Sequence, residues 1–218
     1  MKLLLISLCI IFDIVYIICN TKQKNIIGLF SKTFAALCFI CLGYLGYKTN
    51  STAFNYYILI GLILDGFGDL FLAIRNIFAK NVSFLIGTLC FLAGHILYIK
   101  GLYILNNNYL LINIVLGLII GSIIFRLYYK VCKFNKVLHY VGYVYISTII
   151  IMVLMSIGVF LTTFETNSLI FMIGSLFFVS SDLILVLYNF SKRKKWMHPT
   201  YSLLYFIGQI LISISLHI

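Results

Sequence analysis

The sequence predicts an all-α, polytopic membrane protein with eight transmembrane helices. Hydrophobic residues make up 63% of the 218 positions and charged residues only 10%, and proline occurs once. A soluble domain is about half apolar and about a quarter charged, so this composition excludes a water-soluble globule. Runs such as Leu110–Phe125 are apolar around the whole helix. That pattern is typical of a lipid-facing or buried helix and excludes the alternating strands of a transmembrane β-barrel.

The eight helices follow from the length of apolar segment that crosses a bilayer, about 20 residues. Along the chain this length predicts helices at residues 2–19, 27–47, 54–74, 82–105, 109–129, 137–161, 167–190 and 199–217. The first segment lacks a small-residue cleavage site, so we expect it to be retained rather than removed as a signal peptide. The connections, such as Asn20–Asn25 and Ser191–His198, are short and polar. We therefore expect a single transmembrane domain over residues 1–218.

The basic residues predict how the helices are oriented. Twelve of the 16 Lys and Arg residues fall in the odd-numbered connections, whereas the other side holds only Lys2, Lys48 and Lys100. Cytoplasmic loops of membrane proteins are enriched in Lys and Arg, so both termini are predicted to be non-cytoplasmic. This pattern also accounts for the net charge of +11 without a nucleic-acid partner. Abundant Ile, Asn, Lys and Phe are typical of an AT-rich genome and favour a bacterial inner (cell) membrane.

A few ionisable residues lie inside the predicted spans, where each costs at least about 2.5 kcal/mol unless it has a partner or a function. At about 1.5 Å per residue, Asp69 lies about 9 Å inside the Arg75 end of its helix, and Asp182 about 15 Å inside the Lys192 end. Glycines such as Gly174 precede several of these positions and would let helices approach closely. The sequence therefore predicts a polar cavity open toward the cytoplasm. The ionisable residues are Asp13, Lys32, Asp65, Asp69, His95 and Asp182, accompanied by Gln209.

These residues leave more than one interpretation open. Asp65 and Asp69 are four positions apart and share one helix face. They either pair with Lys32 or Arg75 as internal ions or form part of a catalytic site. Lys32 alternatively extends its amine toward the lipid headgroups. The four histidines are too dispersed to predict a zinc site, so we expect no metal.

Four groups of residues, taken in order, resemble the YhhN family of eight-helix membrane proteins, whose characterised members are lysoplasmalogenases. The resemblance covers the second to the eighth helix. At Thr33, Asp65 and Val186 the chain departs from the family, which normally has a proline, a small residue and an alanine there. The four groups are Gly61-Leu62 leading into Gly68-Asp69, Gly87-x-x-x-Phe91-x-x-x-His95-x-x-Tyr98, Gly174-x-x-Phe177-x-x-Ser180-Ser181-Asp182 followed by Phe190, and Tyr205-x-x-x-Gln209.

The resemblance implies hydrolysis of the vinyl ether bond of lysoplasmalogen, giving a fatty aldehyde and glycerophosphocholine or glycerophosphoethanolamine. The expected partners are the lysophospholipid, water and membrane lipid, and no cofactor is expected. Acid/base chemistry suits a pair of buried carboxyl groups, one protonated and one ionised, and we assign these roles to Asp69 and Asp182. Asp182 is the deeper of the two and the better candidate for the acid. Lys32 is expected to hold the lipid phosphate, and the remaining substrate-binding candidates are Asp65, His95, Tyr98, Tyr205 and Gln209.

Three other functions are compatible with the sequence. A transporter using the aspartates as a proton relay would carry polar residues through to the outer side and contain an inverted repeat, and neither is found. A lipid-binding protein without turnover would not need two carboxyl groups. A hydrolase of another lysolipid remains open, especially given Asp65. A serine triad is disfavoured because no G-x-S-x-G motif occurs.

Overall fold

The computed structural model describes residues 1–75, 77–78, 80–133 and 136–217. Within them the chain forms eight α-helices and no strand. Every helix begins and ends within two residues of its predicted bounds, which confirms the all-α fold. The helices are α1 (Lys2–Thr21), α2 (Asn25–Thr49), α3 (Ala53–Ile74), α4 (Lys80–Leu105), α5 (Leu110–Tyr129), α6 (Lys136–Thr163), α7 (Thr166–Phe190) and α8 (Met197–Ser215).

Seven helices of the described chain, α1 to α7, are long and apolar enough to cross a membrane, so the chain is an integral membrane protein. The eighth predicted span, α8, is less apolar because it carries buried polar side chains such as His198, Ser202 and Gln209. It packs against α1, α2, α3 and α7. Polar residues are tolerated on a helix that faces protein rather than lipid. Whether α8 crosses the membrane, and on which side the termini lie, stay predictions.

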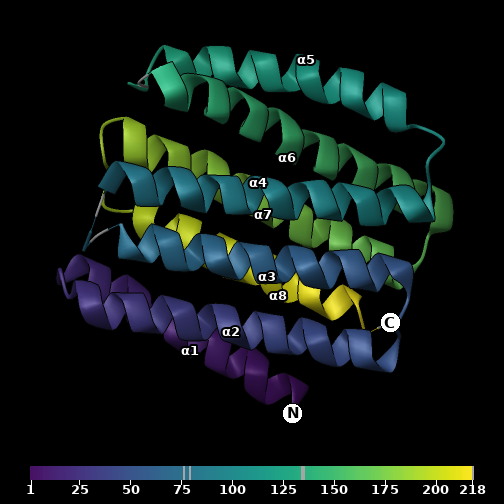
Figure 1. The fold of residues 1–218 in the computed structure, drawn as a ribbon, viewed down its shortest axis with the longest axis horizontal. Coiled ribbons are helices and arrows are strands. Elements are labelled where there is room, and N and C mark those ends of the chain that lie inside the picture. Colours follow the sequence, from purple (N-terminus) through teal and green to yellow (C-terminus); the bar gives the residue numbers. More distant parts are fainter. Residues whose placement is uncertain (76, 79, 134–135, 218) are drawn as a thin grey trace.

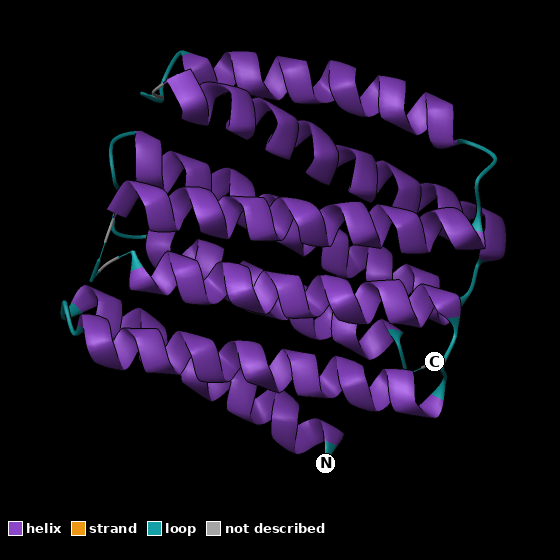
Figure 2. Ribbon diagram, in the orientation of Figure 1, coloured by secondary structure: helices purple, strands orange, loops and turns teal. Residues whose placement is uncertain are grey.

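The helices are arranged in two rows (Figure 1). In one row α2, α3 and α4 lie side by side in chain order, and behind them α1, α8, α7 and α6 form the second row. The remaining helix, α5, packs against α6 at one edge. The odd-numbered connections gather at one end of the bundle, whereas the even-numbered ones lie at the other (Figure 2). We call the first of these the odd-loop end.

The backbones of α7 and α8 touch where two glycines meet. A Cβ atom added to Gly174 would lie 3.0 Å from the carbonyl oxygen of Gly208 and 3.1 Å from the amide nitrogen of Ile212. A Cβ atom on Gly208 would likewise lie 3.0 Å from the carbonyl oxygen of Gly174. Small residues permit this approach between helices. The contact fixes the spacing of the two helices that carry Asp182 and Tyr205.

Gly174→Ala is therefore expected to destabilise the protein by about 1–3 kcal/mol, the usual cost of overpacking. The methyl group meets backbone atoms of α8, which cannot rotate away as a side chain would. Thermal unfolding in detergent measures the effect. Gly158→Ala on α6 is the matched control, since its Cβ would meet only the side-chain nitrogen of Asn113 at an ordinary 3.6 Å. Equal melting temperatures for the two variants would contradict the close contact.

Candidate functional site

Asp69 lies on α3 next to a buried lysine. Its Oδ1 atom is 3.0 Å from the Nζ atom of Lys32 on α2, and both side chains are almost completely buried. The hydroxyl of Tyr205 on α8 donates a hydrogen bond of 2.7 Å to Oδ2. The lysine amine also lies 5.5 Å from the ring centre of Tyr16 and 5.9 Å from that of Tyr205. The structure thus shows Lys32 in an internal ion pair, while its expected contact with a lipid phosphate stays a prediction.

Asp182 lies on α7 in a different environment. Its Oδ2 atom accepts a hydrogen bond from the hydroxyl of Tyr145 on α6. That hydroxyl lies 3.3 Å from the Nε2 atom of His95, whose ring packs edge-on against Phe178. In the described part of the chain, no basic side chain lies within ion-pair distance of Asp182. Asp69 thus faces an ammonium group, whereas Asp182 faces a phenol.

Asp65 occupies a third position, one helical turn before Asp69. Its Oδ2 atom accepts hydrogen bonds from the hydroxyl of Tyr98 at 2.6 Å and from the amide of Gln209 at 2.7 Å. The same amide nitrogen donates to the hydroxyl of Tyr205 at 3.2 Å. A buried chain of hydrogen bonds therefore joins Asp65 to Asp69 through α8. Such chains fix the orientation of every member.

The two predicted catalytic aspartates line one small chamber. Its volume is about 20 Å³, which is room for about one water molecule. The chamber is closed by residues of α2, α3, α4, α7 and α8, so five helices meet around it. The polar residues that line it are Lys32, Asp69, Ser181, Asp182, Tyr201, Ser202 and Tyr205.

Two further cavities share walls with this chamber. At the odd-loop end lies a polar cavity of about 300 Å³, which shares Lys32 and Tyr201 with the chamber. An apolar cavity of about 40 Å³ lies between α3, α4, α6 and α7 and includes Asp182 in its wall. Leu72 and Leu185 line all three. The chamber therefore lies where the polar and the apolar cavity meet.

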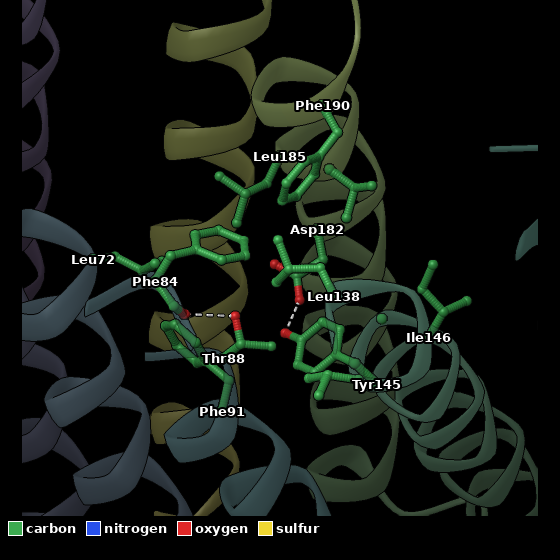
Figure 3. Close-up of a pocket in the computed structure, with 13 residues that line it drawn as sticks. Leu72, Phe84, Thr88, Phe91, Leu138, Tyr145, Ile146, Asp182, Leu185 and Phe190 are labelled. Carbon is green, nitrogen blue, oxygen red and sulfur yellow. Dashed lines mark hydrogen bonds between the residues drawn. The ribbon is translucent and has the colours of Figure 1, made fainter. Parts of the chain in front are cut away.

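Figure 3 shows the apolar cavity, in which Asp182 and Tyr145 are joined by their hydrogen bond. The side chains of Leu72, Phe91 and Leu185 surround the same space. Among the described residues that line it, Asp182 alone carries a carboxyl group. An apolar ligand group in this cavity would thus lie directly beside a carboxyl group.

The predicted site residues fall into two layers. Lys32, Asp69, Asp182 and Tyr205 line the chamber itself. The others line none of the three cavities and lie behind the first layer as hydrogen-bonding partners; they are Asp65, His95, Tyr98 and Gln209. Their expected contact with substrate stays a prediction.

The sequence interpretation missed Tyr145, the hydrogen-bond donor to Asp182. The only signal was a tyrosine in the middle of an apolar helix, and the chain has 16 tyrosines. Asp13, one of the ionisable residues predicted inside the spans, is buried and accepts a hydrogen bond of 2.5 Å from Ser202. No group of three or more His, Cys, Asp or Glu side chains in the described residues is arranged to hold a metal ion.

Fold and site together define a helical integral membrane protein with two buried aspartates in a chamber between a polar and an apolar cavity. The model of the YhhN family matches residues 27–216, and the chain belongs to this family. This confirms the resemblance drawn from the sequence motifs. No curated protein and no solved structure is similar enough to be matched with the chain.

Proposed function

We propose that the protein is a lysoplasmalogenase, a hydrolase that cleaves the vinyl ether bond of lysoplasmalogen within the membrane. The main support for this proposal is the position of the aspartate chamber between a polar and an apolar cavity. A lysoplasmalogen has the same order of parts, because its vinyl ether bond joins a polar glycerophosphate to an apolar alkenyl chain. Membership of the YhhN family supports the proposal.

Vinyl ether hydrolysis requires a proton on carbon. The π electrons of the double bond take the proton at the β-carbon, and an oxygen lone pair stabilises the resulting oxocarbenium ion. Water then adds to the carbon next to oxygen and loses a proton, which gives a hemiacetal. The bond between the hemiacetal carbon and the former ether oxygen then breaks. The leaving oxygen takes up a proton while the hemiacetal hydroxyl loses one, so that the products are glycerophosphocholine or glycerophosphoethanolamine and a fatty aldehyde.

The two aspartates divide these steps. Asp182 is the acid, since it lines the apolar cavity where the alkenyl chain would begin and, among the described residues, has no basic side chain within ion-pair distance that would hold it ionised. Asp69 is the ionised partner, because its charge is paired with Lys32. It would stabilise the oxocarbenium ion and take the proton of the attacking water. Two carboxyl groups in contrasting environments with separate roles are a recurring catalytic arrangement.

Residues in and behind the chamber wall hold this pair in place. Tyr145 orients Asp182, and His95 contacts Tyr145 from behind. Tyr205 orients Asp69 and is itself held by Gln209. Rigid support of this kind keeps reacting groups in productive geometry.

The membrane arrangement is part of the proposal. We propose that all eight helices cross a bacterial inner membrane with both termini on the non-cytoplasmic side. The polar cavity at the odd-loop end would then open toward the cytoplasm. Headgroups of the inner leaflet would reach it directly.

The test is to give purified protein in detergent three lysophosphoethanolamines that differ only in their chain linkage, which is a vinyl ether, an alkyl ether or an acyl ester. We expect a fatty aldehyde and glycerophosphoethanolamine from the vinyl ether alone. Fatty acid released from the ester at a comparable rate would instead indicate a hydrolase of other lysolipids. No turnover of any lipid by monodisperse protein would contradict the proposal and favour a binding or transport role.

A further inference from the structure

Among the residues that the structure describes, the polar cavity at the odd-loop end is lined by basic side chains and by no acidic one. Its basic residues are Lys32, Arg75 and Arg193. The charge of Lys32 is offset by Asp69. Neither arginine has an acidic side chain within ion-pair distance in the part of the chain that the structure describes. Within the described chain, the two arginines of this cavity therefore carry positive charges that no acidic side chain offsets.

Arg75 is held in one position at the end of α3. One terminal nitrogen donates a hydrogen bond of 2.8 Å to the Oδ1 atom of Asn189, and the guanidinium carbon lies 4.8 Å from the ring centre of Phe84. The amide nitrogen of Asn189 donates to the carbonyl of Leu185, which fixes the amide. The Nε atom of Arg75 is buried and finds no hydrogen-bond partner among the residues that the structure describes. The Arg75 side chain is thus held in one orientation, and its Nε–H group is left to donate a hydrogen bond to a ligand.

Arg193 supplies a second guanidinium group at the mouth of the cavity. Its Nε atom donates to the carbonyl of Tyr188 at 3.2 Å, and its guanidinium carbon lies 4.8 Å from the ring centre of the same residue. Burial, and next the charge of Arg193, lower the pKa of Arg75 from its ordinary value. The two groups therefore repel each other, and an anion bound between them would remove that repulsion.

We propose that the polar cavity is a phosphodiester-binding site in which Arg75 and Arg193 hold the headgroup phosphate of the lysophospholipid. The identity of the lipid rests on the proposed function. A guanidinium group presents parallel N–H donors that match two phosphate oxygens, and an aromatic ring beneath it limits its motion. The site shares Leu72 and Leu185 with the aspartate chamber, so a bound phosphate lies next to the reacting bond.

This assignment changes the role of Lys32. The lysine neutralises Asp69 on one side of the chamber, and the arginines bind the phosphate at the opening. Recognition of the headgroup and support of the catalytic carboxylate are therefore separate tasks of separate cations. Loss of an arginine should weaken binding without disturbing the aspartate pair.

The experiment measures equilibrium binding of two lipid analogues to detergent-purified protein. One is a saturated alkyl-ether lysophosphoethanolamine, which has no bond for the enzyme to cleave, and the other is the alkylglycerol of the same chain that lacks phosphate. Arg75→Gln is expected to weaken binding of the phospholipid analogue at least about tenfold, the effect of losing one charged hydrogen-bonding group, and to leave the alkylglycerol unchanged. Arg193→Gln is expected to have a smaller effect because its side chain is exposed.

Lys195→Gln is the matched control. Lys195 lies with Arg193 in the connection between α7 and α8, is exposed and carries the same charge, but it does not line the cavity. We expect this substitution to leave both affinities unchanged. Equal weakening of both analogues by Arg75→Gln, or no weakening of either, would overturn the assignment. Inorganic phosphate forms the third arm. If it alone binds as tightly as the phospholipid analogue, the cavity is a site for free phosphate and not for a lipid headgroup.

Failure of this proposal and failure of the proposed function give different results. Binding of the analogue does not depend on turnover. A wild-type protein that binds the phospholipid through Arg75 but releases no aldehyde would keep the phosphate site and refute the hydrolase. Aldehyde release that persists in Arg75→Gln with an unchanged Michaelis constant would refute the phosphate site and keep the hydrolase.

Discussion

Asp182→Asn is expected to lower aldehyde release from lysoplasmalogen by about 10²- to 10⁴-fold, the usual contribution of a general acid. Asparagine has nearly the same shape, and its carbonyl oxygen still accepts the hydrogen bond from Tyr145. It has no carboxyl proton to deliver to the β-carbon. The variant therefore removes the chemistry while keeping the packing. Initial rates from an aldehyde-coupled assay measure the loss of catalysis, and size-exclusion profiles show whether the variant is still folded.

Asp13→Asn is the matched control for this variant. Asp13 is equally buried and bonded to Ser202, but it lines none of the three cavities of the site. We expect it to affect stability and to keep turnover within a few-fold of wild type. If folded Asp182→Asn retained about a tenth or more of the wild-type rate, a general-acid role worth 10²-fold or more would be contradicted.

The second large effect is expected from the ion pair between Lys32 and Asp69. Removing one partner leaves the other as an uncompensated buried charge, which typically costs about 3–5 kcal/mol. Lys32→Met and Asp69→Asn should therefore each lower the melting temperature strongly. The double variant should recover most of the lost stability, because neither charge remains. Aldehyde release should be lost wherever Asp69 is replaced, whether stability recovers or not.

Thermal unfolding of the four proteins in one detergent forms a double-mutant cycle that isolates the interaction. A double variant as unstable as the sum of its two single variants would show that the pair is not coupled. Recovery of activity in the stable double variant would contradict the role of Asp69 in catalysis. The two readouts are needed together, since loss of activity alone would not separate chemistry from folding.

Most of the fold could be predicted from the sequence because membrane helices obey a length rule. An apolar run of about 20 residues bounded by polar connections has one structural solution in a bilayer. The bounds of α3 and α7 were thus predicted within one residue. For α8 the rule is weaker, since a helix enclosed by others is free to carry polar residues such as Ser202 and Gln209.

Several residues of the site were predictable from the sequence, but their hydrogen-bond and ion-pair partners were not. Asp69 and Asp182 stand out because carboxyl groups are costly in a membrane. Which partner each one meets depends on how the helices are rotated and packed, and the pattern of apolar and polar residues does not reveal that. Lys32 illustrates this, since an ion pair and a headgroup contact were both open until α2 and α3 were placed side by side.

Residues at the helix ends were the hardest to interpret. Arg75 and Arg193 belong to the basic connections, where a positive charge needs no explanation beyond orientation. Only the fold places them on one cavity with Asn189. Tyr145 posed the same problem within a span, because a buried tyrosine is common and only its partner makes it part of the site.

The most direct test of the account is to run the wild-type reaction in D₂O and analyse the aldehyde after immediate enzymatic reduction to the alcohol. Protonation by a carboxyl group that exchanges with solvent predicts one deuterium on the carbon adjacent to the former aldehyde carbon. The free aldehyde, incubated and reduced in the same way, corrects for exchange after release. An aldehyde product without that deuterium would contradict protonation at carbon, and with it the role given to Asp182.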